Sequence, residues 1–134
     1  MMREIKFRGL DYEGKWRYGF VFIGKNIPKS LIEIEEGTVQ ITYDVIPETI
    51  GQYIGLKDKN GKDIYEGDIV YVYIPDPPLY SFTGVVVYNP PSFILKGLKE
   101  NSPIADLNDL VNKACYSSDV FEVIGNIYQN PELP

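Results

Sequence analysis

The stretch Gln52–Tyr73, which decides the fold of this chain, reads QYIGLKDKNGKDIYEGDIVYVY. At its centre lies the Asn60-Gly61 dipeptide, a strong signal for a β-hairpin because both residues tolerate left-handed backbone conformations. Apolar residues flank this turn on both sides, and a second turn at 66–68 precedes the apolar run Ile69–Ile74. The stretch therefore predicts strands joined by tight turns in an antiparallel sheet.

Short strands of the same kind are predicted along most of the chain. Tyrosine is frequent, with 11 residues of 134, and its ring suits the pleated, half-buried surface of a sheet. Ten prolines and twelve glycines supply many turns, which is typical of a chain built from short strands. Outside the quoted stretch, the predicted strands are Arg3–Leu10, Trp16–Ile23, Leu31–Ile34, Thr38–Tyr43, Gly84–Tyr88, Ser92–Lys96 and Phe121–Tyr128.

One segment has helical spacing instead. Ser102 is a suitable cap and Pro103 suits the first helical position, and the apolar residues that follow recur every three or four positions. The sequence therefore predicts a mainly β (β-rich α+β) fold with antiparallel sheets and one short helix near 103–115. An SH3-like small barrel is one arrangement compatible with these strands.

The length of 134 residues fits a single domain over 1–134, and the sequence shows no internal repeat. The turn-prone segment 47–51 also allows two lobes, an N-terminal one over 1–46 and a C-terminal one over 52–130. No segment approaches the roughly 20 apolar residues of a membrane-spanning helix. We expect a protein of the bacterial cytoplasm that does not associate with membranes.

The composition excludes much of enzyme chemistry. The chain has no histidine and one cysteine, Cys115, so it lacks the residues for Ser-His-Asp or Cys-His hydrolysis and for histidine-ligated metals. We interpret Cys115 as a buried small apolar residue. No catalytic residue, cofactor or metal ligand is predicted from these residues.

Charge is unevenly distributed along the chain, whose net charge is −6. Residues 1–29 contain seven Lys or Arg against three Asp or Glu, whereas residues 30–134 contain six against sixteen. A basic N-terminal segment followed by an acidic remainder is compatible with binding a polyanion or with docking on the acidic part of the same chain or of another subunit. The overall acidity argues against broad, non-specific binding of nucleic acids.

The basic end contains the candidate binding surface, because cationic and aromatic residues alternate there. Rings that stack on bases and cations that meet phosphates are the elements of a single-stranded nucleic-acid platform. The favoured interpretation is an ordinary amphipathic hairpin with aromatic residues inside and cations outside. A subunit contact is the second interpretation and nucleic acid the third. The candidate residues are Lys6, Arg8, Lys15, Trp16 and Arg17.

Two other clusters of residues are candidate sites. The acidic residues of the quoted stretch could hold Mg²⁺ or Ca²⁺, but their spacing does not fit an EF-hand loop, so a solvated hairpin tip is favoured. Tyrosines on neighbouring strands could line a peptide groove, although packing within the sheet is favoured. The acidic cluster comprises Asp58, Asp63, Glu66 and Asp68, and the tyrosine cluster comprises Tyr71, Tyr73, Tyr80 and Tyr88.

Three blocks resemble the YopX family of bacteriophage and prophage proteins. They are MREIKFR at 2–8, GQYIGLKDKNGKDIYEGDIV at 51–70 and FEVIGNIYQNPEL at 121–133. The resemblance implies a phage or prophage origin, a β-rich fold and assembly with itself. It carries over no catalytic motif and therefore no site residues.

The sequence thus favours a non-enzymatic phage or prophage accessory protein that binds a host or phage protein and forms a homo-oligomer. The alternative is a small-barrel nucleic-acid-binding protein that uses the basic aromatic hairpin. A carboxylate-metal enzyme built on Asp58, Asp63 and Asp68 is the least favoured hypothesis.

Overall fold

The computed structural model describes residues 5–23, 30–36, 39–74, 80–89, 92–97, 104–106 and 120–131. The chain divides into two compact units, Met1–Tyr53 and Ile54–Pro134. The boundary between them lies inside strand β5 (Gly51–Lys57), so no separate linker is found at this point. The prediction that the chain is a single domain stays a prediction.

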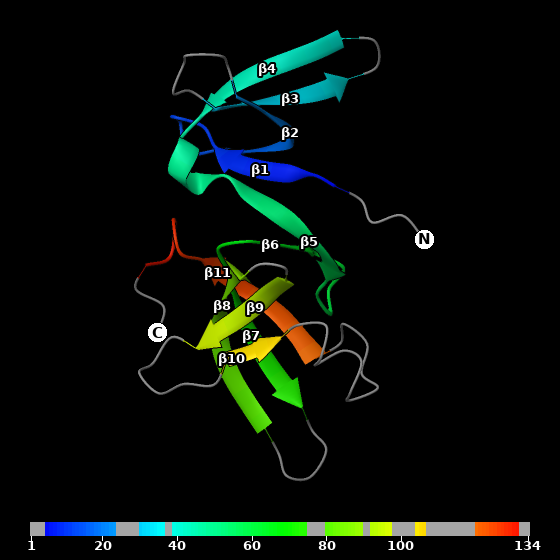
Figure 1. Ribbon diagram of the computed structural model, residues 1–134, viewed down its shortest axis with the longest axis vertical. Helices are drawn as coiled ribbons and strands as arrows, with labels where there is room; N and C mark the ends of the chain where they lie inside the picture. Colours follow the sequence, from blue (N-terminus) through cyan, green and yellow to red (C-terminus); the bar gives the residue numbers. More distant parts are fainter. Residues whose placement is uncertain are drawn as a thin grey trace. The chain divides into compact units, whose positions relative to one another are not determined.

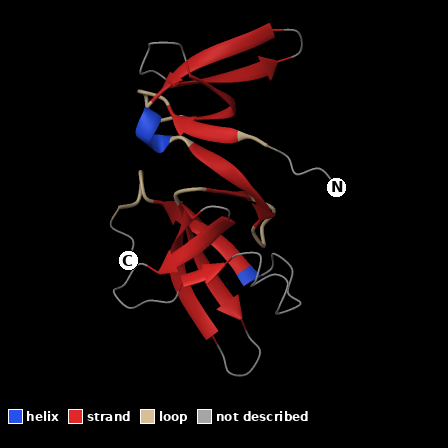
Figure 2. Cartoon of the chain, viewed as in Figure 1, coloured by secondary structure: helices blue, strands red, loops and turns tan. Residues whose placement is uncertain are grey.

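Strands dominate both units, as Figure 2 shows, which confirms the mainly β prediction. A single 3-10 turn, η1 (Pro47–Thr49), separates β4 from β5. The remaining strands of the first unit are β1 (Phe7–Leu10), β2 (Trp16–Ile23), β3 (Ser30–Glu36) and β4 (Val39–Val45). Those after β5 are β6 (Asp63–Tyr65), β7 (Asp68–Ile74), β8 (Tyr80–Asn89), β9 (Ser92–Gly97), β10 (Ile104–Asp106) and β11 (Phe121–Asn126).

The first unit is an antiparallel meander that curls back on itself. Its strands follow the order β4-β3-β2-β1-β5, with β6 continuing the sheet beyond β5 (Figure 1). An isolated bridge joins Asp11, after β1, to Val45 at the end of β4. The amide of Ile46 donates to the Leu10 carbonyl at 2.7 Å, and Thr49 Oγ1 accepts from the Leu10 amide at 2.9 Å. The end of β4 and η1 therefore cover the main chain at the end of β1.

The second unit has the strand order β10-β9-β8-β7-β11. The β7–β8 register places Val70 opposite Gly84 and Val72 opposite Phe82, so these residues share one face of the sheet. That face is covered by apolar side chains from the neighbouring segments and forms the core of the unit. The core residues are Ile54, Ile64, Val70, Val72, Val86, Phe93, Leu95, Val120 and Phe121.

The predicted helix near 103–115 is wrong for residues 104–106. These residues form β10, with Ile104 opposite Lys96 and Asp106 opposite Ile94 on β9. A short apolar run fits either period, and here the free edge of β9 offers main-chain hydrogen bonds that a helix would forgo. Residues 103 and 107–115 lie outside the described residues.

The SH3-like small barrel considered for these strands is not formed as a closed structure in the described part of the chain. Both sheet orders end in strands that have a neighbouring strand on one side only, and the Asp11–Val45 bridge is a single contact. The antiparallel sheets are therefore open, and their edges have to be protected or used in other ways.

Gly67 connects three segments of the second unit. Its amide donates to the Val86 carbonyl at 2.9 Å, and its carbonyl accepts from the Ile127 amide at 2.9 Å. Its φ of +87° lies in the left-handed region, and a β carbon at this position would come within 2.8 Å of Tyr128 Cε2. The turn therefore favours glycine, and an added β carbon would also displace the Tyr128 ring.

The change Gly67→Ala is expected to lower the free energy of unfolding by about 2–4 kcal/mol. Alanine is strained at this positive φ, and its β carbon clashes with the Tyr128 ring, so the two costs add. Gly61→Ala is the matched control, since its φ is +80° and no atom lies within 4 Å of the added carbon. Urea unfolding of both variants gives the comparison. An equal loss of stability in the two variants would show that the Tyr128 contact has no cost.

Candidate binding surface on the N-terminal hairpin

The register of the β1–β2 hairpin decides which side chains share a face. Arg8 is opposite Tyr18 and Leu10 is opposite Trp16, so these four residues lie on one face. Arg17 is opposite Gly9 and lies on the other face. The candidate residues therefore do not form one continuous basic strip on a single side of the hairpin.

Three of the four candidate cations lie over aromatic rings of the same unit. Lys6 Nζ is 4.7 Å from the centroid of Tyr53, and the Arg8 guanidinium is 4.1 Å from that of Trp16. Arg8 is only 3% exposed. Such cation–π contacts contribute roughly 0.5–2 kcal/mol each, more where the cation is shielded from water. Lys6 thus helps to hold the hairpin on β5, whereas the Arg8–Trp16 contact joins the two strands of the hairpin.

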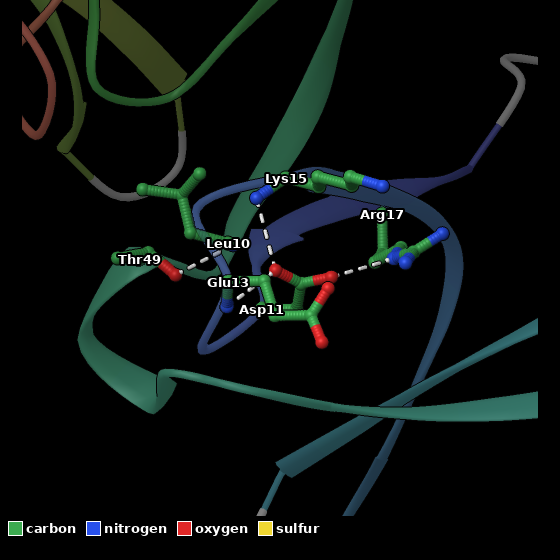
Figure 3. Close-up of polar contacts among 6 residues, drawn as sticks. All are labelled: Leu10, Asp11, Glu13, Lys15, Arg17 and Thr49. Carbon is green, nitrogen blue, oxygen red and sulfur yellow. Dashed lines mark hydrogen bonds and ion pairs between the residues drawn. The ribbon is translucent and has the colours of Figure 1, made fainter.

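The Asp11 turn, residues 11–15, organises the tip of the hairpin (Figure 3). Asp11 Oδ1 accepts the amides of Glu13 and Lys15, both at 2.9 Å, and Oδ2 accepts Arg17 Nε at 2.9 Å. Gly14 takes a φ of +84°, which allows its amide to reach the Asp11 carbonyl at 3.1 Å. The exposed Lys15 side chain extends from this turn.

The environment of Asp11 favours its charged form. The Lys15 amide, together with the Glu13 amide and the Arg17 guanidinium, lowers the pKa of Asp11 below its ordinary value, although burial acts in the opposite direction. On its other side Arg17 stacks on Tyr43, with 4.0 Å between guanidinium carbon and ring centroid. Arg17 therefore joins the hairpin tip to β4.

The Asp58 turn, residues 58–62, repeats the Asp11 turn bond for bond. Asp58 Oδ1 accepts the amides of Asn60 and Lys62 at 2.9 Å, and the Gly61 amide donates to the Asp58 carbonyl at 3.0 Å. The sequence has no extended internal repeat, but both turns share the pattern Asp-x-x-Gly-Lys. That short pattern was the available signal for the shared geometry.

The second oxygen of Asp58 has a different partner from that of Asp11. Oδ2 accepts the Val123 amide of β11 at 3.0 Å, and the Lys59 amide donates to the Phe121 carbonyl at 2.9 Å. Lys59 Nζ also lies 3.3 Å from Glu122 Oε2. The Asp58 turn therefore occupies the edge of β11 that faces away from β7.

Asp63 and Asp68 of the acidic cluster have separate partners. Asp63 pairs with the exposed Lys57 Nζ at 2.8 Å, whereas the buried Asp68 accepts the Tyr65 amide through Oδ2 at 2.8 Å. Burial raises the pKa of Asp58, but the amides of Val123 and the turn outweigh it and lower the pKa overall. Within the described residues, no group of three or more Asp, Glu, Cys or His could hold a metal ion.

Two aromatic side chains of β2 are exposed; they belong to the basic aromatic segment of the sequence but are not among its five candidate residues. Tyr18 is 46% exposed and Phe20 62% exposed. They are two positions apart on one strand, so both lie on the face that carries Arg8 and Trp16. The expected hairpin had aromatic residues inside and cations outside, yet here a cation is buried while these two rings face solvent. We call Tyr18 and Phe20 the aromatic pair.

The tyrosine cluster does not form one groove. Tyr71 and Tyr73 lie opposite Thr83 and Ser81 on one face of the β7–β8 pair, whereas Tyr88 belongs to the opposite face and packs against Phe93 with ring centroids 5.1 Å apart. The side chain of Tyr80 and the residue Cys115 lie outside the described residues.

The fold and these contacts define a class of protein: a chain of two antiparallel β units whose hairpin tips are tied by aspartate side chains. The YopX protein family model matches residues 6–133, and the chain belongs to this family. It is similar to the crystal structure of protein EF1440 from Enterococcus faecalis, with 25% identity, 98% of each chain covered and a TM-score of 0.58. No curated protein matches the chain.

The search for membrane spans covered the helices among the described residues. None of them is long and apolar enough to cross a bilayer.

The change Asp58→Asn is expected to destabilise the protein by about 1–3 kcal/mol near neutral pH, because an amide group cannot accept hydrogen bonds at both of its ends. The pKa of Asp58 is lower in the folded state than in the unfolded state. Its carboxylate therefore contributes to the free energy of unfolding above the ordinary carboxyl pKa of about 4, and this contribution is lost as pH falls through the folded-state pKa. Urea unfolding across this pH range should show the difference between wild type and variant shrinking on acidification.

Asp63→Asn is the control for this prediction. Its carboxylate holds an exposed lysine, so the expected loss is only about 0–1 kcal/mol. A pH-independent difference for Asp58→Asn, or an equal loss in both variants, would contradict the role given to Asp58.

Proposed function

We propose that this chain acts by binding another protein chain rather than by catalysis, and that it also assembles with itself. The observation that supports this proposal is the aromatic pair. Single exposed apolar residues are ordinary on protein surfaces, but two large rings side by side on one strand form an apolar patch that a partner could cover. Aromatic residues are enriched in the centres of protein interfaces.

The carboxylates support the same proposal. Asp11 and Asp58 each accept several main-chain hydrogen bonds, and the pKa of each is lowered. A general acid or base works best with a pKa near the working pH, which for a carboxyl group means a raised value. The shifts at these two residues have the direction expected of groups that stabilise turns.

Membership of the YopX family supports the setting that we propose. Because the resemblance to this family implies a phage or prophage origin, we propose an accessory protein that acts in the bacterial cytoplasm. Its partner would be a host or phage protein that presents an apolar surface to the aromatic pair.

Replacing both rings, as Tyr18→Ser with Phe20→Ser, is expected to reduce recovery of a partner at least tenfold when the tagged chain is used to capture proteins from host cells. Loss of a well-packed interface aromatic typically costs 2 kcal/mol or more, which is about a 30-fold change in affinity. Quantitative mass spectrometry of the captured proteins makes the measurement.

Tyr12→Ser is the control, because Tyr12 is an exposed ring in the Asp11 turn and not on the β2 strand. Equal recovery with the double variant and with wild type would remove the aromatic pair from the proposal. A turnover abolished by one carboxylate substitution would contradict the non-enzymatic assignment.

The alternative function is binding of single-stranded nucleic acid by the same face. Tyr18 and Phe20 would supply stacking rings, and Lys6 lies on this face of the hairpin. The contacts of the arginines speak against it, since Arg8 is buried against Trp16 and Arg17 is paired with Asp11.

If the alternative holds, Phe20→Ala should weaken binding of a fluorescent oligothymidine by about 5- to 150-fold, as expected for loss of one base–aromatic stack. Tyr73→Ala, at a similarly exposed tyrosine of the second unit, should leave binding unchanged. Fluorescence anisotropy at two salt concentrations provides the readout. Undetectable or salt-independent binding at low ionic strength would rule the alternative out.

A further inference from the structure

Strand β4 is the outermost strand of its sheet in the described structure (Figure 1). All seven of its residues pair with β3, from Glu36 opposite Val39 to Ser30 opposite Val45. On its other edge, the Ile46 amide bonds the Leu10 carbonyl and Val45 bridges Asp11. Within the described residues, these contacts lie at the end of that edge.

The direction of the free main-chain groups follows from the Ile46 contact. The main-chain groups of successive residues alternate between the two edges of a strand. Thr42 and Gln40 lie four and six positions before Ile46, so they direct their amide and carbonyl groups to the same side as Ile46 does. Their main-chain groups therefore face away from β3.

Among the described strands, the other edges of the two sheets are protected or short. The Asp58 turn covers the outer edge of β11, with hydrogen bonds to Phe121 and Val123. β6 and β10 are each three residues long. β4 has seven residues in an unbroken register, and its part 39–43 contains no charged residue and no proline. Charges, prolines, bulges and short length are the features that normally prevent edges from pairing.

The sequence of this edge fits a second copy of itself. In an antiparallel pair centred on Ile41, Ile41 lies opposite its own copy, Gln40 opposite Thr42, and Val39 opposite Tyr43. Aromatic and β-branched residues are favourable cross-strand partners. The pairing ends at Tyr43, because the bridge to Asp11 occupies the edge beyond it, so Asp44 faces no like charge within the ladder.

We propose that β4 forms the self-association interface by pairing antiparallel with β4 of a second copy over Val39–Tyr43. The proposal rests on the self-assembly in the proposed function and gives it a surface. The two-fold axis of an antiparallel strand pair is perpendicular to the sheet, so the same face of both copies lies on one side. The dimer then presents two aromatic pairs on one face, which raises the effective affinity for a partner with two matching sites.

The test is sedimentation velocity of the full chain over a range of concentrations. Wild type is expected to reach twice the single-chain mass of 15.3 kDa. Thr42→Pro removes an outward amide from each copy while leaving the bonds to β3 in place, so the dissociation constant should rise about tenfold or more. Thr42→Val keeps the amide and should associate as wild type does. Far-UV circular dichroism should be unchanged in both variants.

Amide hydrogen exchange measured by NMR tests the interface without a variant. The Thr42 amide should exchange more slowly as wild-type concentration rises, whereas the Ile41 amide, which faces β3, should show no such dependence. If Thr42→Pro does not fold, this measurement alone tests whether β4 forms the interface.

The outcomes of these experiments distinguish a failure of the β4 pairing from a failure of the proposed self-assembly. A wild-type monomer at all concentrations would overturn both the β4 pairing and the proposed self-assembly. A wild-type oligomer that Thr42→Pro leaves intact, or whose Thr42 amide exchanges at the same rate as in the dilute monomer, would overturn the β4 pairing alone. Loss of the oligomer in Thr42→Pro but not in Thr42→Val would support it.

Discussion

The structure depends on aspartate side chains that accept hydrogen bonds from main-chain amides in tight turns. A five-residue reversal leaves several amides without a main-chain acceptor, and an unsatisfied buried amide costs about as much as a lost hydrogen bond. In the Asp11 and Asp58 turns, one carboxylate oxygen satisfies two of these amides, and a glycine with positive φ completes the reversal. Each turn then sets the register of the strands around it.

The second carboxylate oxygen gives each turn a different role. In the first unit it holds Arg17, which also stacks on Tyr43 and so connects β2 to β4. In the second unit it accepts the Val123 amide and thereby covers the edge of β11. The same local geometry therefore stabilises one sheet and protects the edge of the other, while no strand pairs with the outer edge of β4 among the described residues.

The N-terminal hairpin shows how tertiary contacts change the meaning of a sequence pattern. Strand alternation places Arg17 and Trp16 on opposite faces, as the observed register does, because the side-chain period of a strand is a local property. Which face is buried is not local. Arg8 is enclosed against Trp16, whereas Tyr18 and Phe20 on the same face are exposed. The identification of basic residues as the binding surface remains a prediction. The exposure of Tyr18 and Phe20, which the favoured interpretation placed inside the hairpin, is what the fold adds.

The sequence by itself determined the strands and turns, since Asn-Gly and Glu-Gly-Asp segments and β-prone runs act over only a few residues. It also showed the family, through the extended block at 51–70. Only the tertiary structure decided that Ile104–Asp106 is a strand, because the edge of β9 supplies its hydrogen bonds. The tertiary structure also decided the second role of Asp58. Its bonds to the turn amides are local, but its bond to the Val123 amide joins residues 65 positions apart. The Gln52–Tyr73 stretch is thus a folding signal in the sequence, and its role in covering a strand edge exists only once β11 lies beside it.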